Sequence, residues 1–69
     1  MNPEFTVHLL NPQGIEKAQE LAKYFDEFLN YIKTVVPEGR YLSLVKTHLE
    51  TASFYSKKGM AINPENQKA

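Results

Sequence analysis

The sequence predicts an all-α protein, a two-helix antiparallel hairpin with a short N-terminal arm that assembles into a helical homo-oligomer. Two long stretches place apolar residues at alternating spacings of three and four, and a short proline–glycine turn separates them. This spacing gathers apolar side chains on one face of an α-helix, and a short connection makes the two helices antiparallel neighbours. An apolar arc too wide for one partner helix predicts the assembly.

The length of 69 residues predicts a single domain, 1–69, that needs help to be stable. A chain of this size buries only about 60 % of its unfolded surface, so a disulfide, a metal or another subunit is usually required. The chain has no cysteine, and His8 and His48 lie too far apart for a local metal motif. We therefore expect support from oligomerisation, with no metal and no cofactor.

The arm, residues 1–10, alternates Phe5, Val7 and Leu9 with Thr6 and His8. A period of two is typical of an extended segment that lies on an apolar surface. That surface belongs either to the same hairpin or to a neighbouring subunit. We interpret His8, on the polar side, as a surface residue rather than a ligand.

The first helix is expected over residues 12–36. Asn11 is a favourable N-cap, Pro12 suits the first helical position, and Pro37 ends the helix. The stripe expected to pack on the second helix consists of Ile15, Ala18, Ala22, Phe25, Leu29, Ile32 and Val36. A second stripe, with its members seven residues apart, consists of Leu21, Phe28 and Val35, and Tyr24 and Tyr31 widen the apolar arc.

The second helix is expected over residues 39–60, after a turn made by Pro-Glu-Gly-Arg. Its apolar stripe continues the same spacing with Leu42, Val45, Leu49 and Ala52. In the tail, residues 63–69, Asn63-Pro64 repeats the helix-start signal with only five residues after it. We expect Glu65 to Ala69 to be frayed.

Charge is balanced overall but uneven along the chain. Eight basic and eight acidic residues give zero net charge, which disfavours binding to duplex nucleic acid. Residues 38–60 nevertheless carry a net charge of plus two, from Arg40, Lys46, Lys57 and Lys58 against Glu38 and Glu50. No apolar run reaches the length of a membrane span and no signal-peptide pattern begins the chain, so we expect a soluble, cytoplasmic protein.

A candidate anion site lies at the start of the second helix. Arg40, Thr47 and Thr51 share one helical face, with Lys46 one residue beside it. An arginine fork near a helix N-terminus favours anions, and this spacing suits a compact ligand with two or three phosphates. In the alternative interpretation Arg40 pairs with Glu38 or with an acid of the first helix, and Lys46 is a plain surface lysine.

Tyr41, Tyr24 and Tyr55 are candidates for stacking on bases, although each suits a core or an interface equally well. Catalytic signals are absent from the sequence: it has no cysteine nucleophile, no distinctive carboxylate pair, no metal-ligand cluster and no phosphate-binding glycine loop. We therefore expect a protein that is not an enzyme.

Two motifs carry a family resemblance. They are L-N-P-x-G-I-x-K-A at residues 10–18 and P-E-G-R-Y-L-S-L-V-K-T-H-L-E-T-A at residues 37–52. The pattern, over about residues 9–62, resembles the small hairpin domain shared by phage anti-CBASS and anti-Thoeris sponge proteins. This resemblance implies a non-enzymatic protein that sequesters cyclic oligonucleotide immune signals, cyclic dinucleotides or cyclic trinucleotides, in the host cytoplasm. It also implies interlocked homo-oligomers, often hexamers.

The resemblance also implies site residues. The turn arginine, here Arg40, is associated with the trinucleotide pocket, and Lys46 and Thr47 fall on adjacent family positions. For the dinucleotide pocket, Phe5 is the candidate for stacking and Lys23 the candidate for phosphate binding. This chain is shorter than several relatives, and neither Phe5 nor Lys23 lies in a motif that fixes the alignment.

Two functions of other classes remain open from the residues alone. The first is a structural or partner-protein-binding helical module that docks its wide apolar arc. The second is a small nucleic-acid binder that uses the positive half of the chain. A cyclic nucleotide should stabilise a sponge, a protein partner should stabilise a module, and a nucleic-acid binder should show steep salt dependence.

Overall fold

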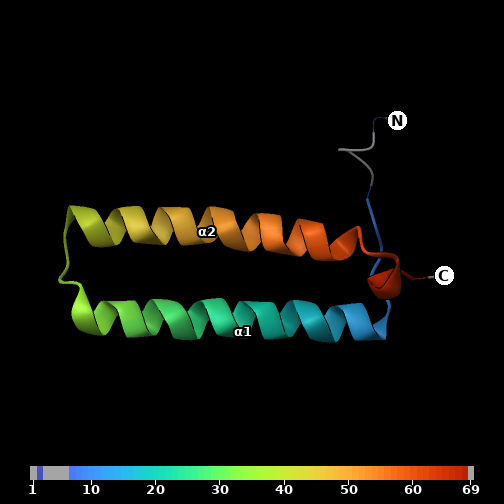
Figure 1. The fold of residues 1–69 in the computed structure, drawn as a ribbon, viewed down its shortest axis with the longest axis horizontal. Helices are drawn as coiled ribbons and strands as arrows, with labels where there is room; N and C mark the ends of the chain where they lie inside the picture. The colour runs from blue at the N-terminus through green and yellow to red at the C-terminus, as the bar shows by residue number, and fades with distance from the viewer. Residues whose placement is uncertain (1, 3–6, 69) are drawn as a thin grey trace.

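The computed structural model describes residues 2 and 7–68 and shows a helical hairpin (Figure 1). Helices α1 (Pro12–Val35) and α2 (Arg40–Ala61) run antiparallel. A short 3-10 helix, η2 (Pro64–Asn66), packs against both helices at the end of the hairpin opposite the turn. Over the described part of the chain there is no strand, only one isolated antiparallel bridge between Leu10 and Gln67. The expected all-helical hairpin is confirmed.

Helix α1 begins and ends as the local chemistry dictates. Asn11 is the N-cap, and its side-chain oxygen accepts a hydrogen bond of 2.7 Å from the Gly14 amide while Pro12 occupies the first turn. Val36 is extended, with φ −115° and ψ 118°, because the ring of Pro37 disfavours a helical conformation before it. The helix therefore ends at Val35, one residue before the expected boundary.

Gly39 makes the turn into α2. Its φ of 147° is open to glycine but strained for other residues, and α2 begins directly after it at Arg40. Because Gly39 is also the N-cap, no side chain caps the first amides of α2. Helix α2 ends at Ala61, so it is displaced by one residue at each end from the expected 39–60.

The hairpin is a single layer of secondary structure. Its principal extents are 45 × 25 × 11 Å, and the smallest matches the diameter of one helix, about 10–12 Å. The radius of gyration is 14.8 Å, whereas a compact chain of this length has about 11 Å. Stable domains pack at least two layers around a core, so both broad faces of this layer lack the usual cover.

Burial is correspondingly slight. Leu42, 3 % exposed, is the one buried large hydrophobic residue among those described. The seam between the helices is otherwise half-buried. It is formed by Ala18, Leu21, Phe25, Leu29 and Ile32 of α1 and by Val36 directly after it, with Val45, Leu49, Ser53, Ser56 and Met60 of α2. Leu21 thus lies in the seam, and Ala22, expected there, is exposed.

The C-terminal tail is ordered through residue 68, which corrects the expectation that it is frayed. The Asn11 amide donates to the Asn66 carbonyl at 2.9 Å, and the Lys68 amide donates to the Leu9 carbonyl at 2.8 Å. Asn11 Nδ2 adds bonds of 2.8 Å to the Glu65 carbonyl and 3.1 Å to the Gln67 carbonyl. We call the paired segments 9–11 and 65–68 the terminal clasp.

The terminal clasp also holds the end of α2. Asn66, 2 % exposed, donates from Nδ2 to the Met60 carbonyl at 3.0 Å, and Gln67 donates from Nε2 to the Ala61 carbonyl at 3.1 Å. These side chains satisfy carbonyls that the last turn of a helix leaves without intrahelical partners. The start of α1 and the end of α2 are therefore joined through the tail.

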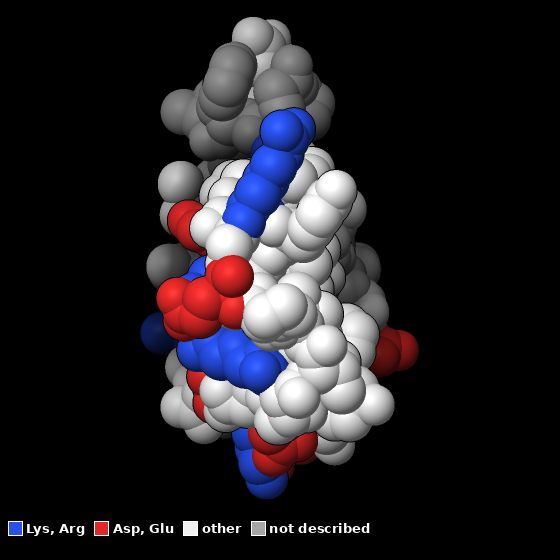
Figure 2. All heavy atoms as spheres, turned by 90° about the vertical axis from the view of Figure 1, so that its left-hand side faces the viewer, with Lys and Arg blue, Asp and Glu red and all other residues white. Residues whose placement is uncertain are grey.

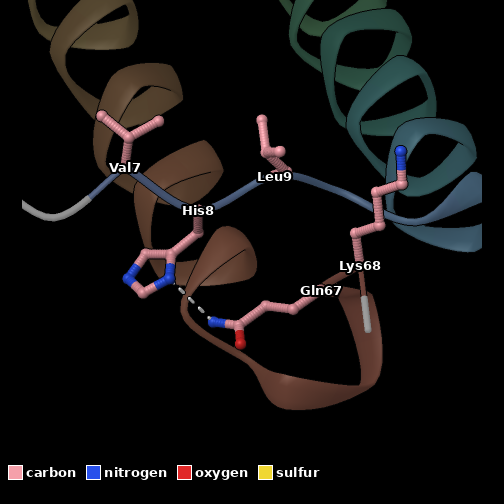
Figure 3. A pocket seen from close by; sticks show the side chains of 5 residues that line it. All are labelled: Val7, His8, Leu9, Gln67 and Lys68. Atoms are coloured by element: carbon pink, nitrogen blue, oxygen red, sulfur yellow. Dashed lines mark hydrogen bonds between the residues drawn. The ribbon is translucent and has the colours of Figure 1, made fainter.

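The arm lies against the clasp through its polar side. Gln67 Nε2 is hydrogen-bonded to His8 Nδ1 at 3.1 Å, whereas Val7 and Leu9 point away from Gln67 (Figure 3). Val7 is 83 % and Leu9 67 % exposed, so these two apolar side chains in the described part of the arm have no cover in a single chain. Phe5 lies outside the described residues.

Replacing Gly14 by alanine should open the clasp. A Cβ at Gly14 would clash with the Asn66 carbonyl oxygen, which belongs to the clasp backbone and cannot move alone. We expect Gly14→Ala to lower the free energy of unfolding by about 1–3 kcal/mol. Chemical denaturation at fixed protein concentration measures this loss.

Gly59→Ala is the matched control, because a Cβ there meets nothing within 4 Å in the hairpin. It should raise the free energy of unfolding by up to about 1 kcal/mol through helix propensity. Equal effects of the two substitutions would contradict the close approach of Gly14 to the clasp.

Candidate anion site at the start of α2

Arg40 is the first residue of α2, and its side chain is exposed. No carboxylate of the described residues lies within ion-pair distance of it, so the alternative pairing with Glu38 or an α1 acid is not formed. The first turn of α2 has no acidic residue and no side-chain cap. Its free amides, the positive end of the helix dipole and the guanidinium therefore favour an anion together.

Thr47 and Thr51 lie on the same outer edge of α2 as Arg40, but their hydroxyl hydrogens are engaged. Thr47 Oγ1 donates to the Ser43 carbonyl and Thr51 Oγ1 to the Thr47 carbonyl, both at 3.1 Å. Such bonds to the preceding turn are common for threonine in helices. To donate to a phosphate, each hydroxyl must rotate and give up this bond.

Lys46 lies on a different side of α2 from Arg40. It lines a shallow groove along the seam with Asp26, Glu50 and Lys57, although Thr47 beside it is on the outer edge. Successive helical residues diverge by about 100°, which separates these two neighbours. The structure therefore does not bring Arg40, Lys46 and Thr47 into one pocket of a single chain.

Glu50 lines both the Lys46 groove and the dent that contains Thr47. Its carboxylate opposes phosphate binding at either place, whereas Arg40 is about 15 Å farther along the helix. The first turn of α2 itself contains no acidic residue, although Glu38 lies two residues before Arg40.

Lys23 lies on the edge of α1 that faces away from α2. Its Nζ is 4.0 Å from Glu27 Oε1, and both side chains are more than half exposed, so the pair contributes little to stability. Lys23 and Arg40 occupy the opposite outer edges of the two-helix layer, one on α1 and one on α2. One compact ligand on a single chain cannot contact both of them.

The tyrosines share one broad face. Tyr41 is 77 % exposed, and Tyr24 and Tyr55 are exposed to a similar degree. Helical spacing from the seam residues Phe25 and Leu49 places all four tyrosines on the side opposite the Lys46 groove. We define this tyrosine face as Leu21, Tyr24, Phe28, Tyr31 and Val35 of α1 with Tyr41, Val45, His48, Ala52 and Tyr55 of α2.

The opposite side is the charged face. Asp26, Lys46, Glu50 and Lys57 line its groove, and helical spacing adds Lys33. Figure 2 looks along the helices from the turn: charged side chains gather on the left of the layer, while the right is largely uncharged. The layer is therefore amphipathic as a whole.

Phe54 was not singled out from the sequence. It lines the same dent as Thr47, Thr51 and Glu50, and its ring contacts that of Tyr55 edge to face, with 5.4 Å between centroids and an angle of 76°. The sequence does contain a signal for Phe54: it follows Thr47 by seven residues, which places Phe54 and Thr47 on the same edge of α2.

The described residues contain neither a metal-binding cluster nor a membrane-spanning helix. Among residues 2 and 7–68, no three histidine or acidic side chains are grouped so that they could hold a metal ion. No helix in that part of the chain has the length and apolar character to cross a membrane.

Arg40→Ala should leave the stability of the protein within about 0.5 kcal/mol of the wild type, because the side chain is exposed and has no ion-pair partner among residues 2 and 7–68. Leu42→Ala, two residues away, removes a buried side chain and should cost about 2–5 kcal/mol. Chemical denaturation of both variants measures the contrast. A large loss in Arg40→Ala would make Arg40 a structural residue.

The comparisons with known proteins identify the family. Residues 2–61 match the family described as "Acb2/Tad1, hairpin domain". No curated protein and no solved structure matches the chain. Because the family match spans most of the sequence, the chain belongs to the Acb2/Tad1 hairpin family, the anti-CBASS and anti-Thoeris sponge family.

Proposed function

We propose that this member of the Acb2/Tad1 hairpin family is a non-enzymatic anti-defence sponge. It binds cyclic oligonucleotide immune signals, cyclic dinucleotides, cyclic trinucleotides or both, in the host cytoplasm and keeps them from their effectors. The family match over residues 2–61 is the observation that carries the proposal. Sequestration requires affinity rather than turnover, so no nucleophile or general base is needed.

The chemistry of the first turn of α2 supports a phosphate-bearing ligand. The planar guanidinium of Arg40 can donate two parallel hydrogen bonds to a phosphate, and the uncapped amides beside it add further donors. The ring of Tyr41, the next residue, is exposed and can stack on a base. A cyclic oligonucleotide offers both groups, phosphates and bases, in one compact molecule.

The separation of the candidates within one chain supports an oligomeric site. Arg40 lies on the outer edge of α2, Lys46 in the groove and Lys23 on the outer edge of α1. A single hairpin therefore cannot enclose a ligand with all three. Pooling edges from several subunits would bring such groups together around one ligand. We therefore propose a homo-oligomer, for which the family resemblance implies six subunits.

The magnitudes are adequate for a sponge. Nanomolar binding corresponds to about −12 kcal/mol. Hydrogen bonds to charged groups contribute about 1.5–3 kcal/mol each, and stacking of a base on an aromatic ring contributes about 1–3 kcal/mol. A few arginine contacts with phosphates, together with two stacked bases in an enclosed site, reach this range.

The second candidate function is a helical module that binds a partner protein without a small ligand. The exposed tyrosine face favours it, since apolar and aromatic surface of this kind is typical of docking sites. The two functions differ in which molecule stabilises the fold. A module responds to its partner and ignores cyclic nucleotides.

Thermal unfolding against a panel of cyclic dinucleotides, cyclic trinucleotides and cyclic ADP-ribose isomers tests the proposal. A ligand at 100 times its Kd stabilises the folded state by about 2.7 kcal/mol. For a domain of this size, the melting temperature should then rise by about 10 °C or more. No shift with any member of the panel would contradict the sponge and favour the module.

Arg40→Ala should weaken the ligand found in that panel by about 10- to 150-fold, the loss of about 1.5–3 kcal/mol from a charged hydrogen bond. Lys57→Ala is the matched control, because it removes the same charge from the same helix about 25 Å away. Isothermal titration calorimetry measures both variants. Equal losses would mean that overall charge, rather than the first turn of α2, governs binding.

A further inference from the structure

The tyrosine face is the largest feature of the molecule that a ligand site on the edges of the layer leaves unexplained. Tyr24, Phe28, Tyr31, Val35 and Tyr41 are between 53 % and 77 % exposed. A single layer offers them no second element to pack against. The question is which molecule covers this face.

The exposed area has the size that one more copy would remove. The chain exposes 5650 Å², whereas a folded monomer of 7.9 kDa typically exposes about 4,400 Å². The excess exceeds the roughly 800 Å² that each partner contributes to a stable interface. Covering one broad face would therefore give this chain the exposure of an ordinary folded protein.

The spacing on each helix suits packing against further helices. Leu21, Tyr24, Phe28, Tyr31 and Val35 follow one another at intervals of three, four, three and four, which is the heptad spacing of a second helical interface. On α2 the same face shows intervals of four, three, four and three with Tyr41, Val45, His48, Ala52 and Tyr55. Leu21 and Val45 are half-buried in the first seam and border the second. Both helices thus present a second seam, beside the one that joins them.

The distribution of charge selects the same face. None of the ten residues that define the tyrosine face is acidic, lysine or arginine, so two copies can press them together without like-charge repulsion. Lys17, one turn before Leu21, marks the end of this uncharged stretch. Tyrosine hydroxyls at the rim can still find water or hydrogen-bond partners. The charged face carries Asp26, Lys33, Lys46, Glu50 and Lys57, and packing it on itself would desolvate all of them.

We infer that two copies of this chain pack face to face through their tyrosine faces, giving a two-layer unit of four helices. The charged faces and the edges with Arg40 and Lys23 then lie outside this unit, where further copies and ligand can reach them. The inference deepens the proposed function, since it rests on an oligomeric sponge and assigns the tyrosine face to assembly. Tyr41, next to Arg40 at the turn end of this face, is the one member also proposed to meet a base of the ligand.

Single-cysteine cross-linking of the full chain tests the inference, because the protein has no cysteine of its own. Tyr24→Cys, Phe28→Cys and Tyr31→Cys each place one thiol on the tyrosine face. Gln19→Cys, Asp26→Cys and Lys33→Cys place one on the opposite side of the same helix. Each variant is treated with a short bis-maleimide, and covalent dimer is quantified on a denaturing gel.

At least one tyrosine-face variant should give mostly covalent dimer, several-fold more than every charged-face variant. Equal cross-linking on both faces, or a monomeric wild type by light scattering, would overturn the inference. Tyr24→Lys should also shift the mass distribution toward smaller species, whereas Gln19→Lys should not. Circular dichroism shows whether Tyr24→Lys is folded, and the cross-linking result holds if it is not.

The ligand panel keeps this test separate from the proposed function. Nucleotide binding without cross-linking through the tyrosine face would reject the inference and leave the sponge in place. Cross-linking without binding of any cyclic nucleotide would reject the sponge and retain the face-to-face pair.

Discussion

Two helices side by side form one layer, and one layer cannot bury the apolar surface that these helices carry. The consequence is visible in the burial of side chains: among the described residues, only Leu42 is a buried large hydrophobic residue, and the rest of the seam is half-exposed. The properties proposed for the protein follow from this constraint. In the proposed assembly a second copy covers one broad face, and the same association can bring separated side chains together around one ligand.

The terminal clasp partly compensates for the thin seam. It joins the start of α1 to the end of α2 through Asn11, Asn66 and Gln67, and it requires glycine at position 14 so that the tail backbone can approach the helix. The clasp also directs the apolar side of the arm, Val7 and Leu9, away from the chain's own tail. The sequence predicts that the arm lies on its own hairpin or on a neighbouring subunit. The polar side of the arm, at His8, contacts its own hairpin, and Val7 and Leu9 remain open to a neighbouring subunit.

Local rules predicted much of the fold. The Asn11-Pro12 cap, the stop at Pro37 and the turn at Gly39 fixed both helices to within one residue, because each depends on a few neighbouring residues. The ordered tail was missed, since the backbone bonds from Asn66 and Lys68 to the arm span most of the chain and leave no local pattern. Lys46 and Thr47 both follow Arg40 by about two helical turns, which groups them in the sequence analysis. Rotation about the helix axis instead places Lys46 in the groove and Thr47 on the outer edge. In the proposed oligomer, other subunits determine how the candidate residues Arg40, Lys23 and Phe5 combine, and sequence spacing within one chain does not describe that.

The central claim is that an assembly of these hairpins captures a cyclic oligonucleotide and holds it unchanged. Native mass spectrometry of the purified protein, before and after addition of ligand, measures the subunit number, the number of bound ligands and the mass of the ligand released on denaturation. The account predicts an oligomer that binds a fixed number of cyclic oligonucleotides and releases them with unaltered mass. A monomer that binds none, or a released ligand with a changed mass, would contradict it.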